Sequence, residues 1–340
     1  MIHPPLAAWH VDAAHQAAPL GNLALESGET IREFHQSYVT HGRLAADRRN
    51  AILVCSAITG THHRLDFLIG PGKALDPARW FIVATDAIGN GLTTSPSNSR
   101  LQPGMAFPRF TIRDMVEAQR RLLVEHLGIP ALYAVAGASM GGMQALQWAV
   151  SCPAMVQRVV AMTPMARTTP WAVLVLETAR ACLTADPAWN GREFKRRPDR
   201  GWRAYAGLMN ALLMKTPDAV DARPPAFEDV VAAMAATGFD AHDYLYQSWA
   251  YAAHDVGTTR GITGGTLGAL ARIAAPTLVL APPLDLFNPA AAAREAAKAI
   301  PGARFVEIPS VEGHLAAGPQ SPADAAFLNE TIGAFLRDTA

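Results

Sequence analysis

The chain has 340 residues, and its 29 Lys and Arg residues balance 29 Asp and Glu residues, so its formal net charge at pH 7 is zero. Nucleic-acid-binding proteins carry a basic patch or stripe, and disordered chains combine low hydrophobicity with high net charge, so neither class fits a neutral chain that is 50% hydrophobic. At this length, folding buries roughly three quarters of the surface of the unfolded chain, which allows a full hydrophobic core.

Apolar runs bounded by turn residues recur along the chain. Residues 23–26 and 34–40 predict an antiparallel pair of strands at the edge of a sheet. Six later runs are short, continuous and rich in Val, Ile and Leu, as is typical of strands that are buried on both faces. They are residues 51–58, 80–86, 131–136, 156–162, 276–281 and 304–308.

Helical patterns lie between these runs, for example at residues 112–127 and 290–299. The last helix has a clear start, because Ser321 can cap it, Pro322 suits the first turn and Asp324 lies near the positive end of the dipole. Strands that alternate with helices predict an α/β fold with a mostly parallel sheet and helices on both faces.

Residues 166–270 interrupt the alternation, because they contain only helical patterns broken by Pro and Gly. We interpret this segment as a helical cap inserted into an α/β core formed by residues 1–165 and 271–340. The segment is rich in aromatic residues, most of which we expect to pack the cap and a minority to line a pocket. They are Trp171, Trp189, Trp202, Trp249, Tyr205, Tyr244, Tyr246 and Tyr251.

The sharpest chemical signal is the sequence Gly-Ala-Ser-Met-Gly-Gly at residues 137–142. It follows the predicted strand 131–136 directly and precedes the helical stretch 143–150. A G-x-S-x-G sequence between a strand and a helix forms a tight turn that exposes the serine, and the helix N-terminus adds N–H donors beside it. This context predicts that Ser139 is a nucleophile.

A serine nucleophile needs a base and a carboxylate that orients the base, and in this arrangement they follow in the chain order Ser, Asp or Glu, His. Asp285 follows the predicted strand 276–281, and His314 follows the last predicted strand. Both therefore lie at the carboxyl edge of the sheet, where Ser139 also lies. Glu312 and Asp255 are the alternative acids, although Glu312 is close in sequence to His314 and Asp255 fits a structural role in the cap.

The tetrahedral intermediate of acyl transfer requires two N–H donors for its oxyanion. We expect the backbone N–H groups of Met140, directly after the nucleophile, and of Ile58, in the loop after the first core strand, with Thr59 as the alternative to Ile58. The adjacent histidines His62 and His63 have no Asp, Glu or Cys at metal-ligand spacing, so we predict no metal, and the chemistry requires no cofactor.

The compartment is also predicted from composition. Three cysteines, Cys55, Cys152 and Cys182, are too few for a disulfide framework, so we expect buried free thiols in a reducing compartment. Residues 1–20 lack the basic start and apolar run of a signal peptide, and no run of about 18 apolar residues occurs. We therefore expect a cytoplasmic, soluble protein without membrane or nucleic-acid partners.

Several stretches resemble the homoserine O-acetyltransferase (homoserine transacetylase) family of α/β-hydrolase-fold enzymes. They are residues 56–60 (SAITG), 68–75 (LIGPGKAL), 88–98 (IGNGLTTSPSN), 107–119 (FPRFTIRDMVEAQ) and 137–149 (GASMGGMQALQWA). The resemblance implies an α/β-hydrolase fold with a helical cap, the triad Ser139, Asp285 and His314, an acyl-serine intermediate, and a homodimer joined through the cap.

The chain departs from this family where homoserine, a zwitterion, has to be held. The family has an aspartate directly after the catalytic histidine, where this chain has Leu315, and an arginine in a cap helix, where residues 201–206 end in Ala206. Arg203 lies nearby but three residues away on a helix, and Ser56 replaces the histidine that usually begins the oxyanion loop. Because an unpaired buried charge is costly, these departures favour a hydrolase of a small, uncharged ester.

Three functions follow from these observations. The first is a serine ester hydrolase of the carboxylesterase or acetylesterase type, in which water resolves the acyl-serine. The second is an O-acyltransferase with acetyl-CoA as its co-substrate, which would use the same catalytic residues. The third is a catalytically silent binding protein, which we disfavour because all three triad candidates are present.

Overall fold

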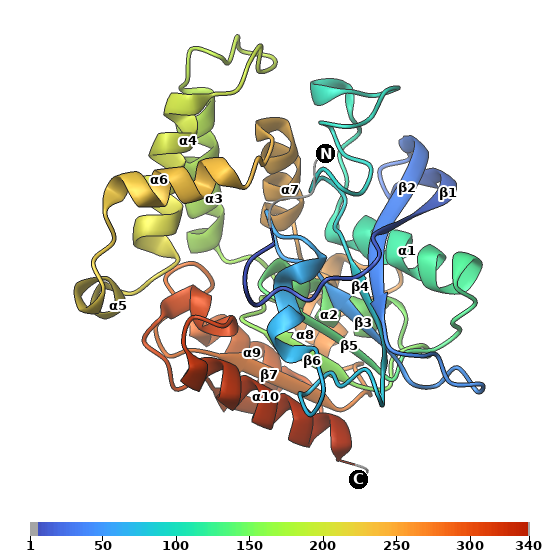
Figure 1. The fold of residues 1–340 in the computed structure, drawn as a ribbon. Helices are drawn as coiled ribbons and strands as arrows, with labels where there is room; N and C mark the ends of the chain where they lie inside the picture. The colour runs from blue at the N-terminus through green and yellow to red at the C-terminus, as the bar shows by residue number, and fades with distance from the viewer. Residues whose placement is uncertain (1–5, 339–340) are drawn as a thin grey trace.

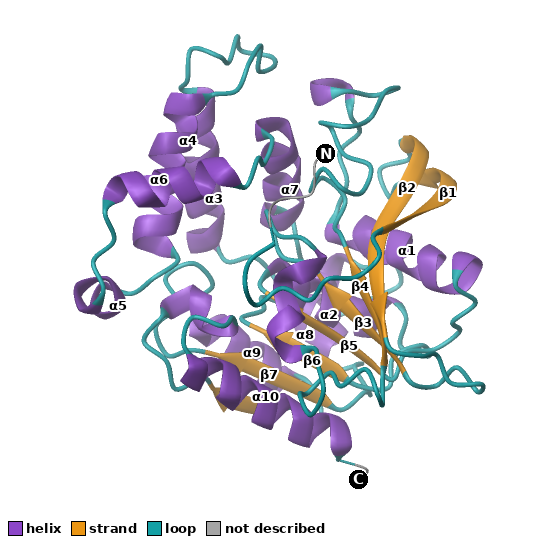
Figure 2. Cartoon of the chain, viewed as in Figure 1, coloured by secondary structure: helices purple, strands orange, loops and turns teal. Residues whose placement is uncertain are grey.

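A central sheet of eight strands organises the computed structural model, which describes residues 6–338 (Figure 2). The strand order is β1-β2-β4-β3-β5-β6-β7-β8, with antiparallel pairing of β1 with β2 and of β2 with β4, and parallel pairing across the rest. The strands are β1 (Gln16–Ala24), β2 (Thr30–His41), β3 (Ala51–Cys55), β4 (Phe81–Thr85), β5 (Ala134–Ala138), β6 (Val159–Met162), β7 (Thr277–Ala281) and β8 (Arg304–Glu307). The predicted α/β class with a mostly parallel sheet is confirmed.

The main error in the predicted strands concerns the first one. We predicted residues 23–26, whereas β1 begins at Gln16 and pairs with β2 over most of its length. The pairing register shifts between Pro19 and Gly21 and again between Gly21 and Leu23, so irregular pairing hides the alternation that identifies a strand. The six core strands are present, although most are shorter than predicted because the flanking apolar residues form buried loops.

Ten α-helices and six short helical turns complete the described chain. The helices are α1 (Ile112–Arg121), α2 (Met140–Ser151), α3 (Pro170–Thr184), α4 (Asp199–Tyr205), α5 (Pro217–Ala222), α6 (Phe227–Ala236), α7 (Ala241–Ala252), α8 (Gly265–Leu270), α9 (Ala290–Ala299) and α10 (Pro322–Arg337). The turns are η1 (His62–Leu68), η2 (Gly104–Ala106), η3 (Leu122–His126), η4 (Ala206–Leu213), η5 (Val256–Thr258) and η6 (Gly313–Ala317). As predicted, Ser321 caps α10, since its hydroxyl accepts the N–H of Asp324 at 3.0 Å.

The two faces of the sheet bury separate clusters. Successive side chains of a strand point to opposite faces, so Leu53 packs with α1 and α2, whereas Val54 packs with η1 and α10 on the other side. Helices α3 to α8 lie between β6 and β7 in the sequence, and Figure 1 shows α3, α4, α6 and α7 grouped apart from the helices that flank the sheet. This group belongs to residues 166–270, which we continue to call the cap.

The cysteines are free, with Cys55 buried and Cys152 and Cys182 partly exposed, so burial was predicted correctly only for Cys55. Across residues 6–338, no helix combines the length and apolar composition that a membrane crossing requires. The predicted absence of a signal peptide concerns residues 1–20, and the first five of these lie outside the described residues.

Candidate active site

Ser139 lies at the turn between β5 and α2, with a backbone φ of 59° and ψ of −124°. Neighbouring glycines make this turn possible by their lack of side chains. A Cβ on Gly137 would lie 2.2 Å from the backbone of Gly141, and a Cβ on Gly141 would lie 2.4 Å from the carbonyl oxygen of Cys55. The motif is therefore required by close backbone packing between the strand, the turn and the helix.

The structure brings the three predicted triad residues together. His314 Nε2 lies 2.8 Å from Ser139 Oγ, and His314 Nδ1 lies 2.7 Å from Asp285 Oδ2. Asp285 Oδ1 accepts the backbone N–H groups of Phe287 and Asn288 at 2.9 and 2.7 Å, which fixes the carboxylate. Ser139 and His314 are only 2% and 1% exposed, so water reaches them little. This geometry allows His314 to take the proton of Ser139 while Asp285 holds the ring in place.

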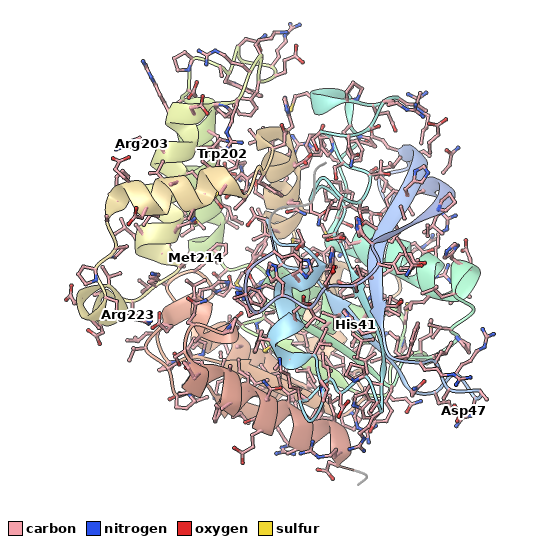
Figure 3. The ribbon with its side chains drawn as sticks, viewed as in Figure 1. His41, Asp47, Trp202, Arg203, Met214 and Arg223 are labelled. Carbon is pink, nitrogen blue, oxygen red and sulfur yellow. The ribbon has the colours of Figure 1, made fainter. Side chains whose placement is uncertain are left out.

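The two alternative acids have other partners. Glu312 forms an ion pair with Arg223 of the cap, and Figure 3 shows Arg223 at α5. Asp255 accepts the N–H of Gly257 and the hydroxyl of Thr266 at 2.7 and 2.8 Å, and so stabilises the chain around η5. Neither carboxylate bonds to His314.

The loop after β3 provides the expected site for an oxyanion. The N–H of Thr59 donates to Gln247 Oε1 at 3.0 Å, so this group, our alternative donor, is already occupied. Within the described residues, the backbone N–H groups of Ile58 and Met140 donate no hydrogen bond to a loop or turn. Met140 is the first residue of α2, and the first N–H groups of a helix have no partner inside it. Ile58 and Met140 therefore stay our predicted donors for an oxyanion.

Backbone strain concentrates around Ser139. Three of the five non-glycine residues with positive φ in the described chain belong to this region, namely Thr59 (57°), Ser139 (59°) and Thr163 (43°). A positive φ is rare for a β-branched residue and persists only where the surrounding structure enforces it. Thr163 follows β6 directly, and its hydroxyl accepts the N–H of Ser139 at 3.2 Å. The sequence reasoning missed Thr163, although its place at the carboxyl edge of the sheet was a usable signal.

The cap contributes two buried side chains to the site from α7, one helical turn apart. Gln247 bonds Thr59 as described and donates to the carbonyl of Ile88 at 3.1 Å. The hydroxyl of Tyr251 donates to Asn288 Oδ1 at 2.8 Å and lies 3.5 Å from Ser139 Oγ. Burial raises the pKa of Tyr251, which keeps the hydroxyl protonated. Sequence reasoning found neither Gln247 nor Asn288, and it named Tyr251 only among the aromatic residues of the cap.

A buried network supports the loop from the opposite side. Asp86, directly after β4, accepts the backbone N–H of His62 at 2.8 Å and Nδ2 of Asn90 at 2.9 Å on Oδ1. Asn90 Nδ2 also donates to the carbonyl of Gly60 at 3.1 Å, within the oxyanion loop. Burial alone would raise the pKa of Asp86, but the ring of His15, whose Nε2 lies 3.6 Å from Oδ2, and the hydrogen bond with His62 hold this pKa well below its usual range. An ionised carboxylate therefore anchors this loop.

The same network includes the set of described residues that could hold a metal ion. Donor atoms of His15, His62 and Asp86 all lie within 4.8 Å of one another, and His63 Nδ1 separately bonds Asp66. Our premise that His62 and His63 have no carboxylate at metal-ligand spacing is therefore wrong for His63, because Asp66 lies three residues later on η1, and the partner of His62, Asp86, comes from the end of β4. Hydrogen bonds already engage both oxygens of Asp86, since Ser37 and His62 Nδ1 donate to Oδ2. These hydrogen bonds give the cluster a structural role, and the absence of a metal stays a prediction.

The positions that would hold a zwitterion are apolar or directed elsewhere. Leu315 follows His314 on η6, and its N–H donates to the carbonyl of Met214 in the cap. Ala206 is fully buried at the start of η4. Arg203 is 48% exposed and forms an ion pair with Glu228 of α6, and Figure 3 shows Arg203 on the cap. It therefore does not replace the arginine that the family carries.

Comparisons of sequence place the chain among known proteins. The family described as alpha/beta hydrolase fold matches residues 50–316. Homoserine O-acetyltransferase of Methanosphaerula palustris is 41% identical over 198 residues, which cover 53% of this chain and 40% of that protein. The homoserine O-acetyltransferase of Geobacter sulfurreducens is 38% identical over 205 residues, which cover 55% of each chain. The match thus spans about half the length of these curated relatives or less.

Solved structures resemble nearly the whole chain. An acetylester hydrolase from Corynebacterium glutamicum is 31% identical, with 96% of both chains covered and a TM-score of 0.89. The acetyl esterase MekB is 30% identical, with 97% of this chain and 98% of that chain covered and a TM-score of 0.89. Homoserine O-acetyltransferase from Bacillus anthracis, at 24% identity and a TM-score of 0.84, covers 96% of this chain and 98% of its own, and shares the fold.

Proposed function

This chain belongs to the α/β-hydrolase fold family, and on that premise we propose that it is a serine ester hydrolase of the carboxylesterase or acetylesterase type. The observation that carries the proposal is the continuous hydrogen-bonded path from Ser139 through His314 to Asp285. Such a path activates a serine hydroxyl, which is a poor nucleophile without a base.

The proposed reaction has two halves. His314 Nε2 takes the proton of Ser139 as Oγ attacks the ester carbonyl, and the N–H groups of Ile58 and Met140 stabilise the oxyanion. The tetrahedral intermediate collapses when His314 gives its proton to the departing alcohol, which leaves an acyl-serine. Water, deprotonated by His314, then attacks the acyl-serine, and collapse releases the acid and restores Ser139. No cofactor takes part.

Two observations support a small ester as the substrate. Leu315 and Ala206 offer no charged pair for an amino-acid zwitterion, and the sequence-based preference for an uncharged ester rests on them. Two solved structures that match 96% and 97% of this chain, at 31% and 30% identity, are described as an acetylester hydrolase and an acetyl esterase. We propose a small, uncharged acyl group such as acetyl.

A second candidate is an O-acyltransferase that passes an acetyl group from acetyl-CoA to an alcohol. The curated relatives favour it directly, because they carry the name homoserine O-acetyltransferase at about 40% identity. It would use the same residues and the same acyl-serine, and only the group that attacks the acyl-serine would differ. The proposed homodimer through the cap applies to both candidates and is tested by light scattering.

Two measurements test these proposals. A fluorophosphonate probe should label the wild-type protein and not Ser139→Ala, and absence of wild-type labelling would revive a binding role. Hydrolysis of p-nitrophenyl acetate and butyrate is compared with release of thiol from acetyl-CoA, with and without homoserine. Efficient ester hydrolysis with negligible homoserine-dependent thiol release supports the hydrolase, and the reverse result establishes the transferase.

A further inference from the structure

Arg64 on η1 is a half-buried cation without a protein partner. Its guanidinium makes no hydrogen bond or ion pair with another residue of the described chain 6–338. Burial lowers the pKa of Arg64 to about 10, so the side chain still carries its charge at neutral pH. The side chain of Arg64 lies beside Gly318, which directly follows η6, the turn that carries His314. A Cβ on Gly318 would lie 3.0 Å from Arg64 Nη1.

Arg64 lines a cavity of about 360 Å³ beside the proposed oxyanion hole. Thr59 and Gly60 of the oxyanion loop form one wall, and Phe239 of the cap lies in the lining as well. The residues that line the cavity include Arg64 and two histidines but no Asp or Glu. The lining therefore carries one fixed positive charge, that of Arg64, and no carboxylate, and the cavity borders the loop that holds Ile58.

Buried charges in proteins are paired, because an unpaired one loses its hydration without compensation. Arginine presents a planar fork that matches a carboxylate with two parallel hydrogen bonds. A half-buried arginine that has no protein partner, in a cavity whose lining carries no carboxylate, thus has the properties of a subsite that is completed by an anionic ligand.

We propose that this cavity is a carboxylate subsite in which Arg64 binds the acid group of the substrate, so that the substrate is an O-acyl hydroxy acid. The inference rests on the proposed function and replaces the expectation of a wholly uncharged ester. It also separates this protein from enzymes of amino-acid esters, because no acidic residue lines the cavity to pair with an ammonium group. Arg64 would be a specificity residue that leaves the triad chemistry unchanged.

A matched series of acetyl esters tests the subsite. We compare kcat/KM for 4-acetoxybutyrate, which has the carboxylate, with that for 4-acetoxybutanamide, which is neutral, and for O-acetylhomoserine, which adds an ammonium group. In the wild type we expect kcat/KM to be highest for 4-acetoxybutyrate, lower for 4-acetoxybutanamide and lowest for O-acetylhomoserine. Arg64→Met should lower the carboxylate-to-amide ratio by about ten- to hundredfold, as expected for loss of a charge-assisted hydrogen bond, and Arg64→Lys should restore part of it.

Arg49→Met is the matched control, because it removes the same charge from an exposed residue in the loop between β2 and β3. The backbone N–H of Arg49 donates to Oδ1 of Asp47, which Figure 3 labels, at 3.1 Å. It should leave the ratio unchanged. A parallel pair, p-nitrophenyl hemisuccinate and p-nitrophenyl butyrate, places the carboxylate on the acyl side. If Arg64→Met affects only this second pair, the acid group belongs to the acyl half of the substrate, which overturns the hydroxy-acid assignment.

The outcomes distinguish the two proposals. The subsite is overturned if the wild type hydrolyses 4-acetoxybutyrate and 4-acetoxybutanamide with nearly equal kcat/KM, or if Arg64→Met does not change the ratio of these two values. Ester hydrolysis itself would still stand. If no ester is hydrolysed, the proposed function fails, and calorimetric binding of 4-acetoxybutyrate to Ser139→Ala decides the subsite. Binding that is lost in Ser139→Ala/Arg64→Met supports the subsite, and binding that is absent or unchanged rejects it.

Discussion

Replacement of Gln247 by leucine tests whether the cap positions the oxyanion loop. The side chain is fully buried on α7 and spans two loops of the core, accepting from the N–H of Thr59 at 3.0 Å and donating to the carbonyl of Ile88 at 3.1 Å. Ile58, whose N–H we assign to the oxyanion, is bonded directly to Thr59. A shift of Thr59 therefore moves the donor.

The magnitude follows from the two hydrogen bonds. Gln247→Leu leaves the partly buried N–H of Thr59 and the buried carbonyl of Ile88 without a partner, which we expect to lower the free energy of unfolding by about 1–4 kcal/mol. Loss of a complete oxyanion donor lowers kcat by roughly a hundred- to a thousandfold. Because Ile58 would be displaced and not removed, we expect kcat/KM to fall by about ten- to a hundredfold, within that upper limit.

The assay pairs hydrolysis of p-nitrophenyl acetate with inhibition by a trifluoromethyl ketone, whose adduct with Ser139 places an oxyanion in the same position. Gln247→Leu should weaken the inhibitor by the same factor as kcat/KM. Gln147→Leu is the matched control, because Gln147, on α2, also makes two side-chain hydrogen bonds, to Ser151 and Thr259. It should lower stability without changing inhibitor affinity.

The reasoning is refuted if both glutamine variants lose stability and activity equally, or if Gln247→Leu retains the affinity of the wild type for the trifluoromethyl ketone. Either result would mean that Gln247 only holds the cap on the core. In that case the position of Ile58 depends on Asp86 and Asn90 beneath the loop.

Three further predictions follow from the site. Asp285→Asn should stay folded by circular dichroism and lose roughly four orders of magnitude in kcat, whereas near-normal activity would return attention to Glu312. Tyr251→Phe removes a hydroxyl that lies 3.5 Å from Ser139 Oγ and bonds Asn288, so kcat/KM should fall less than about tenfold, and a loss beyond a hundredfold would give Tyr251 a direct catalytic role. The pKa of Asp86 is lowered in the folded state, so its contribution is present above the unfolded pKa of about 4 and is lost as the pH falls below it. The difference in urea stability between wild type and Asp86→Asn should accordingly shrink below about pH 4, and a constant difference would contradict the ionised anchor.

The triad was predictable because each member follows a core strand. Parallel strands end at one edge of a sheet, so Ser139, Asp285 and His314 had to approach each other once the order of strands was recognised. The same logic covers Thr163, which also follows a core strand and was overlooked because threonine carried no motif. For identifying residues of the site, a position directly after a core strand was therefore more informative than the type of residue.

The contribution of the cap could not be predicted in this way. Gln247 and Tyr251 reach the site only because α7 packs over the sheet, and no local pattern in residues 166–270 fixes that packing. His62 and Asp86 illustrate a similar limit, since they meet across two strand ends that lie next to each other in the sheet but apart in the sequence. A short motif indicates the local structure of one segment, whereas these contacts depend on the tertiary packing of segments that are far apart in the sequence.

The two candidate functions require the same alcohol site. In hydrolysis the alcohol leaves the tetrahedral intermediate, and in transfer an alcohol enters the acyl-serine along the reverse path, so a group that binds one binds the other. Arg64 at the cavity beside the oxyanion loop would then hold the hydroxy acid in either direction. The near-complete burial of Ser139 and His314 limits water as well as alcohols. The balance between the two functions therefore depends on how well the alcohol is held, and the apolar Leu315 and Ala206 weaken that hold for homoserine in particular.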